Sequence, residues 1–371
     1  MEMNKERWFA TYAMTGVLSR TFVARDREDV ARLVELANGV STELVAKTAI
    51  AAHGRRPRAA AVLVATLAAR DVSMMERVFA RVIDDGNSLR TFCHVVRSGV
   101  LGRKSFGSAP KRAIRGWFAS RSPEDIFRQS SGRSPSMSDV IKMVRPPPRN
   151  DKGEADAVRE ALYGYLVGKN VDSLALPFIK EEPQLAEMNL PELLRHGVLA
   201  DPIVTERIAE RLSRPSEDAR PFALLMTLRK VKADAPRVIV RALEKAIELA
   251  HGNVPRIARG VNVVVDGSGS MLGPLAGARR TPADALRCVD VASLVVDAYR
   301  AMPGDLDIAV SDYEGASMKA DVVIDLQPKS ITISDDRLYV AGFSDEVFDV
   351  VAMYARGDLD RCLSVAESAH L

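Results

Sequence analysis

The string VNVVVDGSGSM at residues 261–271 constrains the fold of this chain more than any other feature. Its valines form a short apolar run that predicts a buried parallel strand over 261–265. Asp266, Ser268 and Ser270 then place one carboxylate and two hydroxyls beyond the carboxyl end of that strand, where open α/β sheets bind ligands. The string therefore predicts an α/β domain with an oxygen-lined site for a hard cation such as Mg²⁺.

Other interpretations of this loop stay open. A run of Gly and Ser is also typical of a plain turn between a strand and a helix. A dinucleotide-binding loop is disfavoured, because the GxGxxG pattern is absent and no Walker-type lysine follows. A phosphohydrolase that uses the Asp266 loop is disfavoured as well, since no second acid stands at a useful spacing.

The composition is that of a globular protein with room for two or three domains in 371 residues. The cysteines, Cys93, Cys288 and Cys362, are widely separated, which argues against a disulfide framework and favours a reducing compartment. No apolar stretch approaches the roughly 20 residues of a membrane helix, and the first residues carry no signal-peptide core. We therefore expect a cytoplasmic protein that does not enter a membrane.

The net charge of +3 hides a strong asymmetry along the chain. Residues 87–149 carry 13 Lys or Arg against 3 Asp or Glu, a local balance of +10. Residues 252–371 carry 11 against 18, a balance of −7. A solvated, arginine-rich helix face is the simpler interpretation of the basic segment. The scarcity of acids within it favours instead a module that binds a polyanion.

The first 250 residues show almost wholly helical patterning. Apolar residues recur with a period of 3.6 over 29–39, 42–54, 57–70, 73–86 and 88–99. Short helices joined by short turns predict stacked helix pairs, as in a solenoid of HEAT-like repeats. We expect this helical module to span residues 1–255.

Beyond this boundary, residues 256–371 are expected to form the α/β domain. A helix is predicted from Thr281 to about Ala301, since a Thr-Pro pair is a good helix start. Strands are predicted at 306–311, 321–326, 330–334, 337–343 and 347–353, and a final helix at 358–371. The fold class predicted for the whole chain is mainly α, with a helical-repeat part followed by an α/β part.

The DGSGSM motif resembles the metal-ion-dependent adhesion signature of von Willebrand factor A domains, Asp-x-Ser-x-Ser. The resemblance implies that Asp266, Ser268 and Ser270 ligate Mg²⁺. The family completes this site with a threonine from a Gly-Gly-Thr-type loop and often a further aspartate, and neither motif is visible here. Thr332 and Asp325 are substitutes by residue type only. We therefore expect half an A domain, or one with an atypical insertion at 303–336.

The segments LRTFCHVVRSGVLGRKSFGSAPKRAIRGWF (89–118) and PSMSDVIKMVRPPPR (135–149) resemble the TROVE module of Ro ribonucleoproteins and bacterial Ro-related proteins. The resemblance implies a monomeric ring of helical repeats closed by the A domain. It implies binding of small noncoding Y-like RNAs on the basic outer face, and of structured or misfolded RNAs whose 3′ ends thread the hole. It further implies association with a 3′-to-5′ exoribonuclease, and no DNA partner.

Basic and hydroxyl side chains of this segment are the candidate RNA contacts, since Lys and Arg bind phosphates and supply most affinity that is independent of sequence. They are Arg90, Arg97, Arg103, Lys104, Ser105, Lys111, Arg112, Arg115, Arg128, Arg133, Lys142 and Arg145.

Three features of the basic segment bear on how it would contact RNA. Ro proteins often carry a histidine at the position of Arg145, so a charge contact is kept there and a stacking role is in doubt. The aromatic side chains are interpreted as core rather than as base-stacking platforms: Phe92, Phe106, Trp117 and Phe118. His94, on an otherwise apolar face, is interpreted as a packing residue.

No catalytic constellation is visible, because the histidines are scattered and neither HExxH nor GxSxG occurs. We expect a ribonucleoprotein scaffold without enzymatic activity. The alternative is an adaptor whose A domain binds a partner's carboxylate through Mg²⁺.

Overall fold

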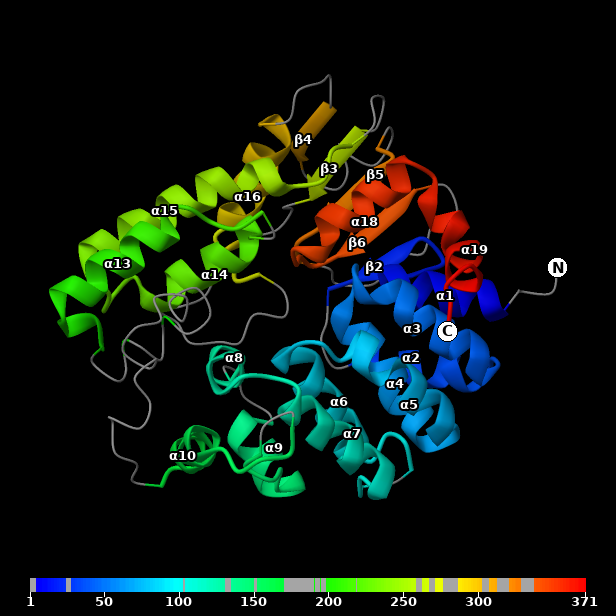
Figure 1. Cartoon of the computed structure of the whole chain (residues 1–371). Coiled ribbons are helices and arrows are strands. Elements are labelled where there is room, and N and C mark those ends of the chain that lie inside the picture. The colour runs from blue at the N-terminus through cyan, green and yellow to red at the C-terminus, as the bar shows by residue number, and fades with distance from the viewer. Residues whose placement is uncertain are drawn as a thin grey trace. The chain divides into compact units, whose positions relative to one another are not determined.

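The structure is a computed structural model of the whole chain, and contacts divide it into two compact units (Figure 1). The first unit comprises residues 1–14, 26–182 and 360–371, and the second comprises 15–25 and 183–359. The residues described are 5–24, 28–102, 104–130, 135–149, 152–169, 190, 194, 198–217, 219–257, 262–266, 271–275, 286–301, 307–311, 320–327 and 337–371. Among them, no helix is long and apolar enough to cross a membrane.

The regular structure in the described part of the first unit is helical apart from a single antiparallel bridge between Arg149 and Ala155. Helix α4 lies at its centre, where every residue from Ala59 to Ala68 is buried, and it packs against α2, α3, α5 and α6. The helices of this unit are α1 (Lys5–Thr15), α2 (Glu28–Asn38), α3 (Thr42–His53), α4 (Pro57–Arg70), α5 (Val72–Val82), α6 (Gly86–Ser98), α7 (Ser108–Ala119), α8 (Pro123–Arg128), α9 (Met137–Val144), α10 (Ala157–Leu166) and α19 (Cys362–Glu367).

Short polar side chains fix where many of these helices begin. Each accepts a hydrogen bond from a backbone N–H of the first turn, which would otherwise be unsatisfied, and such a cap contributes about 1 kcal/mol. The capping residues are Ser41, Asp71, Asp85, Ser122, Ser136 and Asp156. The helix starts are therefore encoded locally.

The second unit is built on a sheet with the strand order β1-β2-β6-β5-β3-β4. All its neighbouring strands run parallel except the β1–β2 hairpin. The strands are β1 (Val17–Leu18), β2 (Thr21–Val23), β3 (Asn262–Asp266), β4 (Asp307–Ser311), β5 (Val322–Asp325) and β6 (Leu338–Ala341). The helices of this unit are α13 (Pro202–Leu212), α14 (Pro221–Val231), α15 (Arg237–Ala250), α16 (Cys288–Arg300) and α18 (Glu346–Ala355).

The core of the second unit lies between the sheet and helices α16 and α18. Alternate strand residues point to this face, for example Val263 and Val265 on β3 and Val322 and Ile324 on β5, and all four are fully buried. The intervening Val323 and its neighbours point to the opposite face and form a smaller cluster.

The predicted fold class is confirmed: the chain is mainly helical, with an α/β part on a largely parallel sheet. Three local predictions were wrong. The helix expected from Thr281 begins only at Cys288, because the residues before it pair with a turn: Leu286 accepts a hydrogen bond from the N–H of Leu275 at 2.8 Å, and Arg287 forms a bridge with Pro274. The apolar run 347–353 is a helix rather than a strand, because a short run buried on most sides has no periodicity that separates the two. Residues 17–23 form a hairpin in a segment expected to be helical.

Several predicted features stay open. The strand predicted at 330–334 lies outside the described residues. The domain boundary predicted between residues 255 and 256 stays a prediction. Grouped by contacts, each unit combines a segment from the N-terminal half of the chain with a segment from the C-terminal half.

Candidate RNA interface

The basic segment occupies helices α6 to α9 of the first unit. Helix α9 packs against both α6 and α7, and α7 packs against α5. The side chain of Arg115 on α7 donates a hydrogen bond from Nε to the carbonyl of Val144 on α9, at 2.8 Å. Residues from distant parts of the segment thus meet near the carboxyl end of α9.

Arg90 differs from the other candidate RNA contacts in that its side chain is buried. Its side chain is only 6% exposed and donates to the Gln129 carbonyl at 2.9 Å and to Oδ1 of Asn87 at 2.5 Å. Burial lowers the pKa of this guanidinium, and the charge of Asp85 opposes that shift. Arg90 ties α6 to α8, so we remove it from the candidate RNA surface.

Most other candidates lie at the surface. The exposed ones are Arg97, Lys104, Ser105, Arg112, Arg115, Lys142 and Arg145, while Lys111 and Arg128 are half-buried. Arg103 and Arg133 lie outside the described residues.

Some of the exposed or half-buried cations already have an acidic partner. Arg112 pairs with Glu76 of α5, and Arg128 pairs with Asp125 at 2.5 Å. The side chains of Arg97, Lys104, Lys142 and Arg145 form no ion pair or hydrogen bond with another described residue. These four cations are therefore the ones most available to phosphate.

Arg145 has an unusual backbone conformation. It caps α9 with φ 47° and ψ 67°, in the left-handed region, and its N–H donates to the Ile141 carbonyl at 2.8 Å. A side chain other than glycine costs roughly 1–2 kcal/mol there. Strain of this kind often marks a functional position, and here it occurs at a cationic residue that follows the carboxyl end of α9, where the helix dipole is negative.

A cleft of about 400 Å³ lies between α6 and α9. It is lined by Cys93, His94, Arg97, Pro135, Asp139, Lys142 and Met143. His94 is exposed, so its interpretation as a packing residue was wrong. Its face of α6 was expected to be apolar throughout, but that face opens onto the cleft, and a helical period alone cannot show this.

The aromatic side chains of the segment are core residues, as interpreted from the sequence. Phe92, Phe106, Trp117 and Phe118 are at most 4% exposed. Phe92 packs edge-on against Phe79, and Trp117 packs edge-on against Phe118. Base stacking on these rings is not available in this conformation.

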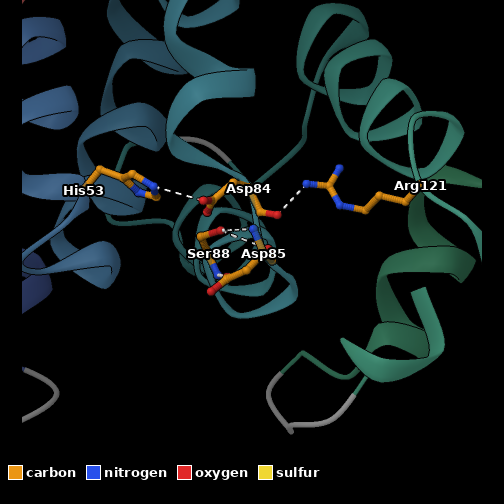
Figure 2. Close-up of polar contacts among 5 residues, drawn as sticks. All are labelled: His53, Asp84, Asp85, Ser88 and Arg121. Carbon is orange, nitrogen blue, oxygen red and sulfur yellow. Dashed lines mark hydrogen bonds and ion pairs between the residues drawn. The ribbon is translucent and has the colours of Figure 1, made fainter. Parts of the chain in front are cut away.

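A polar network fixes the loop between α5 and α6, beside the basic segment (Figure 2). His53 Nε2 lies 3.0 Å from Oδ2 of Asp84, whose carbonyl accepts a 2.5 Å hydrogen bond from Arg121. The Arg121 guanidinium also lies 4.0 Å from the centre of the Trp117 ring. Burial lowers the pKa of Arg121, and Asp84 opposes that shift. Sequence reasoning missed this network, because its members are far apart in the chain.

The predicted oxygen site is described only in part. Asp266 is the last residue of β3, is 2% exposed and lies in register with Asp325 of β5. The Asp325 carboxylate accepts from the Tyr339 hydroxyl at 2.6 Å and from the Gln327 N–H at 2.9 Å. Burial raises the pKa of Asp325, with Asp266 adding to the shift.

The remaining predicted ligands, Ser268 and Ser270, lie outside the described residues, as does Thr332. Within the described ranges no group of three His, Cys, Asp or Glu side chains could hold a metal ion. Asp325, which the sequence suggested by residue type only, is the one candidate substitute that the structure places beside Asp266.

The class that these observations define is a mainly helical protein with an α/β part and a basic helical surface. Its fold is similar to that of the crystal structure of the Ro (RSR) protein of Deinococcus radiodurans, with a TM-score of 0.55 over 96% of this chain and 100% of that chain. The two sequences are 18% identical, so the similarity shows the fold alone. No family model and no curated protein matches the sequence.

Proposed function

We propose that this chain is an RNA-binding scaffold whose contact surface is formed by α6, α7 and α9. The observation that carries the proposal is the group of exposed cations that form no ion pair or hydrogen bond with another described residue: Arg97, Lys104, Lys142 and Arg145. The Ro-like fold supports it. Recognition through phosphates is expected to dominate, because the aromatic rings of this segment are buried.

The test is a binding titration with a hairpin RNA that carries a single-stranded 3′ tail, at 50 to 200 mM salt. Each phosphate contact contributes roughly 0.7–0.9 to the slope of log affinity against log salt. Lys104→Ala with Lys142→Ala removes two contacts, so we expect about tenfold weaker binding and a slope shallower by about 1.5.

The matched control removes two exposed lysines that likewise form no ion pair with a described residue, by Lys230→Ala with Lys245→Ala on α14 and α15. It should leave affinity and slope within about twofold of the unsubstituted protein. A flat salt dependence, or equal losses in both double variants, would contradict the proposal.

We also propose which RNAs this chain binds and to which kind of enzyme it presents them. The ligands are small noncoding, Y-like RNAs and structured RNAs with free 3′ ends, presented by a monomeric protein to a 3′-to-5′ exoribonuclease. The chain itself performs no chemistry, and DNA is not a partner. Sequencing of the RNA that copurifies with the chain tests this extension, since a population without structured small RNAs would contradict it.

A second candidate function is a Mg²⁺-dependent adaptor, favoured by the pairing of Asp266 with Asp325 at the carboxyl edge of the sheet. Carboxylate and hydroxyl oxygens suit a hard cation, and the hydroxyls of Ser268 and Ser270 follow Asp266 in the sequence, outside the described residues. A bound Mg²⁺ would leave a position for a partner's carboxylate. Calorimetric titration with Mg²⁺ tests it, and the binding heat should disappear in Asp266→Asn.

A further inference from the structure

The cleft between α6 and α9 has the chemistry of a nucleotide site. His94 and Arg97 are three residues apart on α6, so they share one face of that helix. Asp139, Lys142 and Met143 share one face of α9 for the same reason. The two faces line a single cleft, and its volume of about 400 Å³ lies within the range of small-ligand sites.

The cations of this cleft have no hydrogen bond to break before they bind a phosphate, although the charge of Lys142 lies near enough to Asp139 to lower the pKa of that carboxyl. Neither Arg97 nor Lys142 forms an ion pair or hydrogen bond within the described part of the chain, and both are exposed. They come from different helices, so together they can hold one phosphate from two sides. Guanidinium and ammonium groups are the usual protein ligands of phosphate.

One carboxylate oxygen of Asp139 remains available to accept a hydrogen bond from a ligand. Its Oδ2 accepts from the N–H and from the hydroxyl of Ser136, at 2.9 and 2.7 Å, in the capping box of α9. These bonds hold the pKa of Asp139 below its ordinary value, so the carboxylate is charged. Oδ1 forms no hydrogen bond with any described residue. A fixed carboxylate of this kind is a common acceptor for a ribose 2′-hydroxyl.

We propose that this cleft binds one unpaired ribonucleotide, with its phosphate between Arg97 and Lys142 and its 2′-hydroxyl donating to Asp139. The base packs against the His94 ring and the Met143 thioether. The inference rests on the proposed RNA-binding function and names one contact within it. The hydrogen bond to the 2′-hydroxyl would allow the protein to distinguish RNA from DNA. Phosphate contacts alone do not make this distinction.

The first experiment compares the hexamers rU6 and dU6, which differ only at the 2′ position, by fluorescence anisotropy. Asp139→Asn keeps the size of the side chain and the cap of α9 but removes the charge. It should weaken rU6 binding roughly fivefold and leave dU6 unchanged, because hydrogen bonds to charged acceptors are about twice as strong as neutral ones. Arg97→Gln with Lys142→Gln should weaken both hexamers about tenfold.

The outcomes separate this inference from the proposed function. If Asp139→Asn tightens both hexamers, the carboxylate faces a phosphate and the inference is wrong. If the Arg97→Gln and Lys142→Gln pair leaves rU6 binding intact while the hairpin RNA still binds, the unpaired nucleotide is held elsewhere. If the unsubstituted protein binds neither the hexamers nor the hairpin RNA, both proposals are wrong.

A second measurement uses the unsubstituted protein, so it does not depend on how a variant folds. Titration with uridine monophosphate should shift the NMR signal of the Met143 methyl group, which Met143→Leu assigns. The methyl of Met74 on α5, outside the cleft, is the internal control. A Met143 signal that does not move, or that moves no more than Met74, contradicts the site.

Discussion

At the scale of single residues, the structure separates arginines that hold the fold from arginines that face solvent. Arg90 and Arg97 stand seven residues apart on α6, yet the first is buried and hydrogen-bonded and the second is exposed. Arg159 is a further structural arginine, 3% exposed, which donates to the Arg121 carbonyl at 2.7 Å and to the Phe118 carbonyl at the end of α7. Charge alone does not identify an RNA contact.

We predict opposite effects for matched substitutions of the α6 pair. Arg90→Met removes both hydrogen bonds of this buried side chain and leaves the half-buried Gln129 carbonyl without its donor, so the free energy of unfolding should fall by about 1–3 kcal/mol. RNA affinity of the folded protein should stay unchanged. Arg97→Met should weaken RNA binding and change the unfolding free energy by less than about 0.5 kcal/mol.

Urea denaturation and RNA titration of both variants check this prediction. Equal stability of the two variants would mean that the buried hydrogen bonds of Arg90 contribute nothing. An affinity loss in Arg90→Met alone would return that residue to the binding surface.

At the scale of elements, Asp345 fixes the start of α14. Its carboxylate accepts from the N–H groups of Phe222 and Ala223, at 3.0 and 2.8 Å. Burial nevertheless raises the pKa of Asp345 to about 6, because the cost of burying the charge exceeds the gain from these bonds and from Arg220, while Asp349 adds repulsion. The junction of α14 with the turn after β6 therefore depends on pH.

We predict that stability falls as pH rises from about 4 to 6. A raised pKa in the folded state means that folding favours the protonated carboxyl. The stability from this group is therefore complete below its ordinary pKa of 3.8 and is lost as pH passes about 6. The change should amount to at most roughly 3 kcal/mol, and the raised pKa of Asp349 acts in the same direction.

Urea denaturation between pH 4 and 7 checks the prediction, and Asp345→Asn should flatten the profile. Asp234→Asn, which alters an exposed carboxylate of the same unit, should leave the profile as it is. An unchanged slope in Asp345→Asn would contradict the assignment.

At the scale of the whole molecule, both ends of the chain belong to the first unit, whereas the hairpin that follows α1 belongs to the second. The C-terminal helix α19 packs against α3 in the first unit, and Arg81 donates to the His370 carbonyl at 2.7 Å. The hairpin β1–β2, near the N-terminus, pairs with β6 in the second unit. The sheet that looked incomplete from its own end of the sequence is extended by strands from the other end.

We predict that the N-terminal hairpin stabilises the sheet directly. Phe22 is 2% exposed in the core of the second unit and lies in register with Val340. Phe22→Ala should cost about 3–5 kcal/mol and speed hydrogen exchange in the β6 peptide. Ile203→Ala, at a side chain 64% exposed in the same unit, is the control and should change neither. Unchanged exchange of β6 in Phe22→Ala would contradict the role of the hairpin.

The sequence by itself determined the local features of this protein. Capping residues such as Ser41, Asp71 and Ser136 fixed helix starts, the valines before Asp266 fixed a buried strand, and the excess of Lys and Arg over 87–149 set the positive charge of that segment. Each of these signals acts over a few residues, so it is visible in the order of the amino acids.

Only the tertiary structure decided which residues meet. It buried Arg90, exposed His94 beside Lys142, set Asp325 beside Asp266 and brought the N-terminal hairpin to β6. These outcomes depend on packing and strand pairing between segments far apart in the chain. A helical or strand period shows which face is apolar, but not which element covers that face or leaves it open.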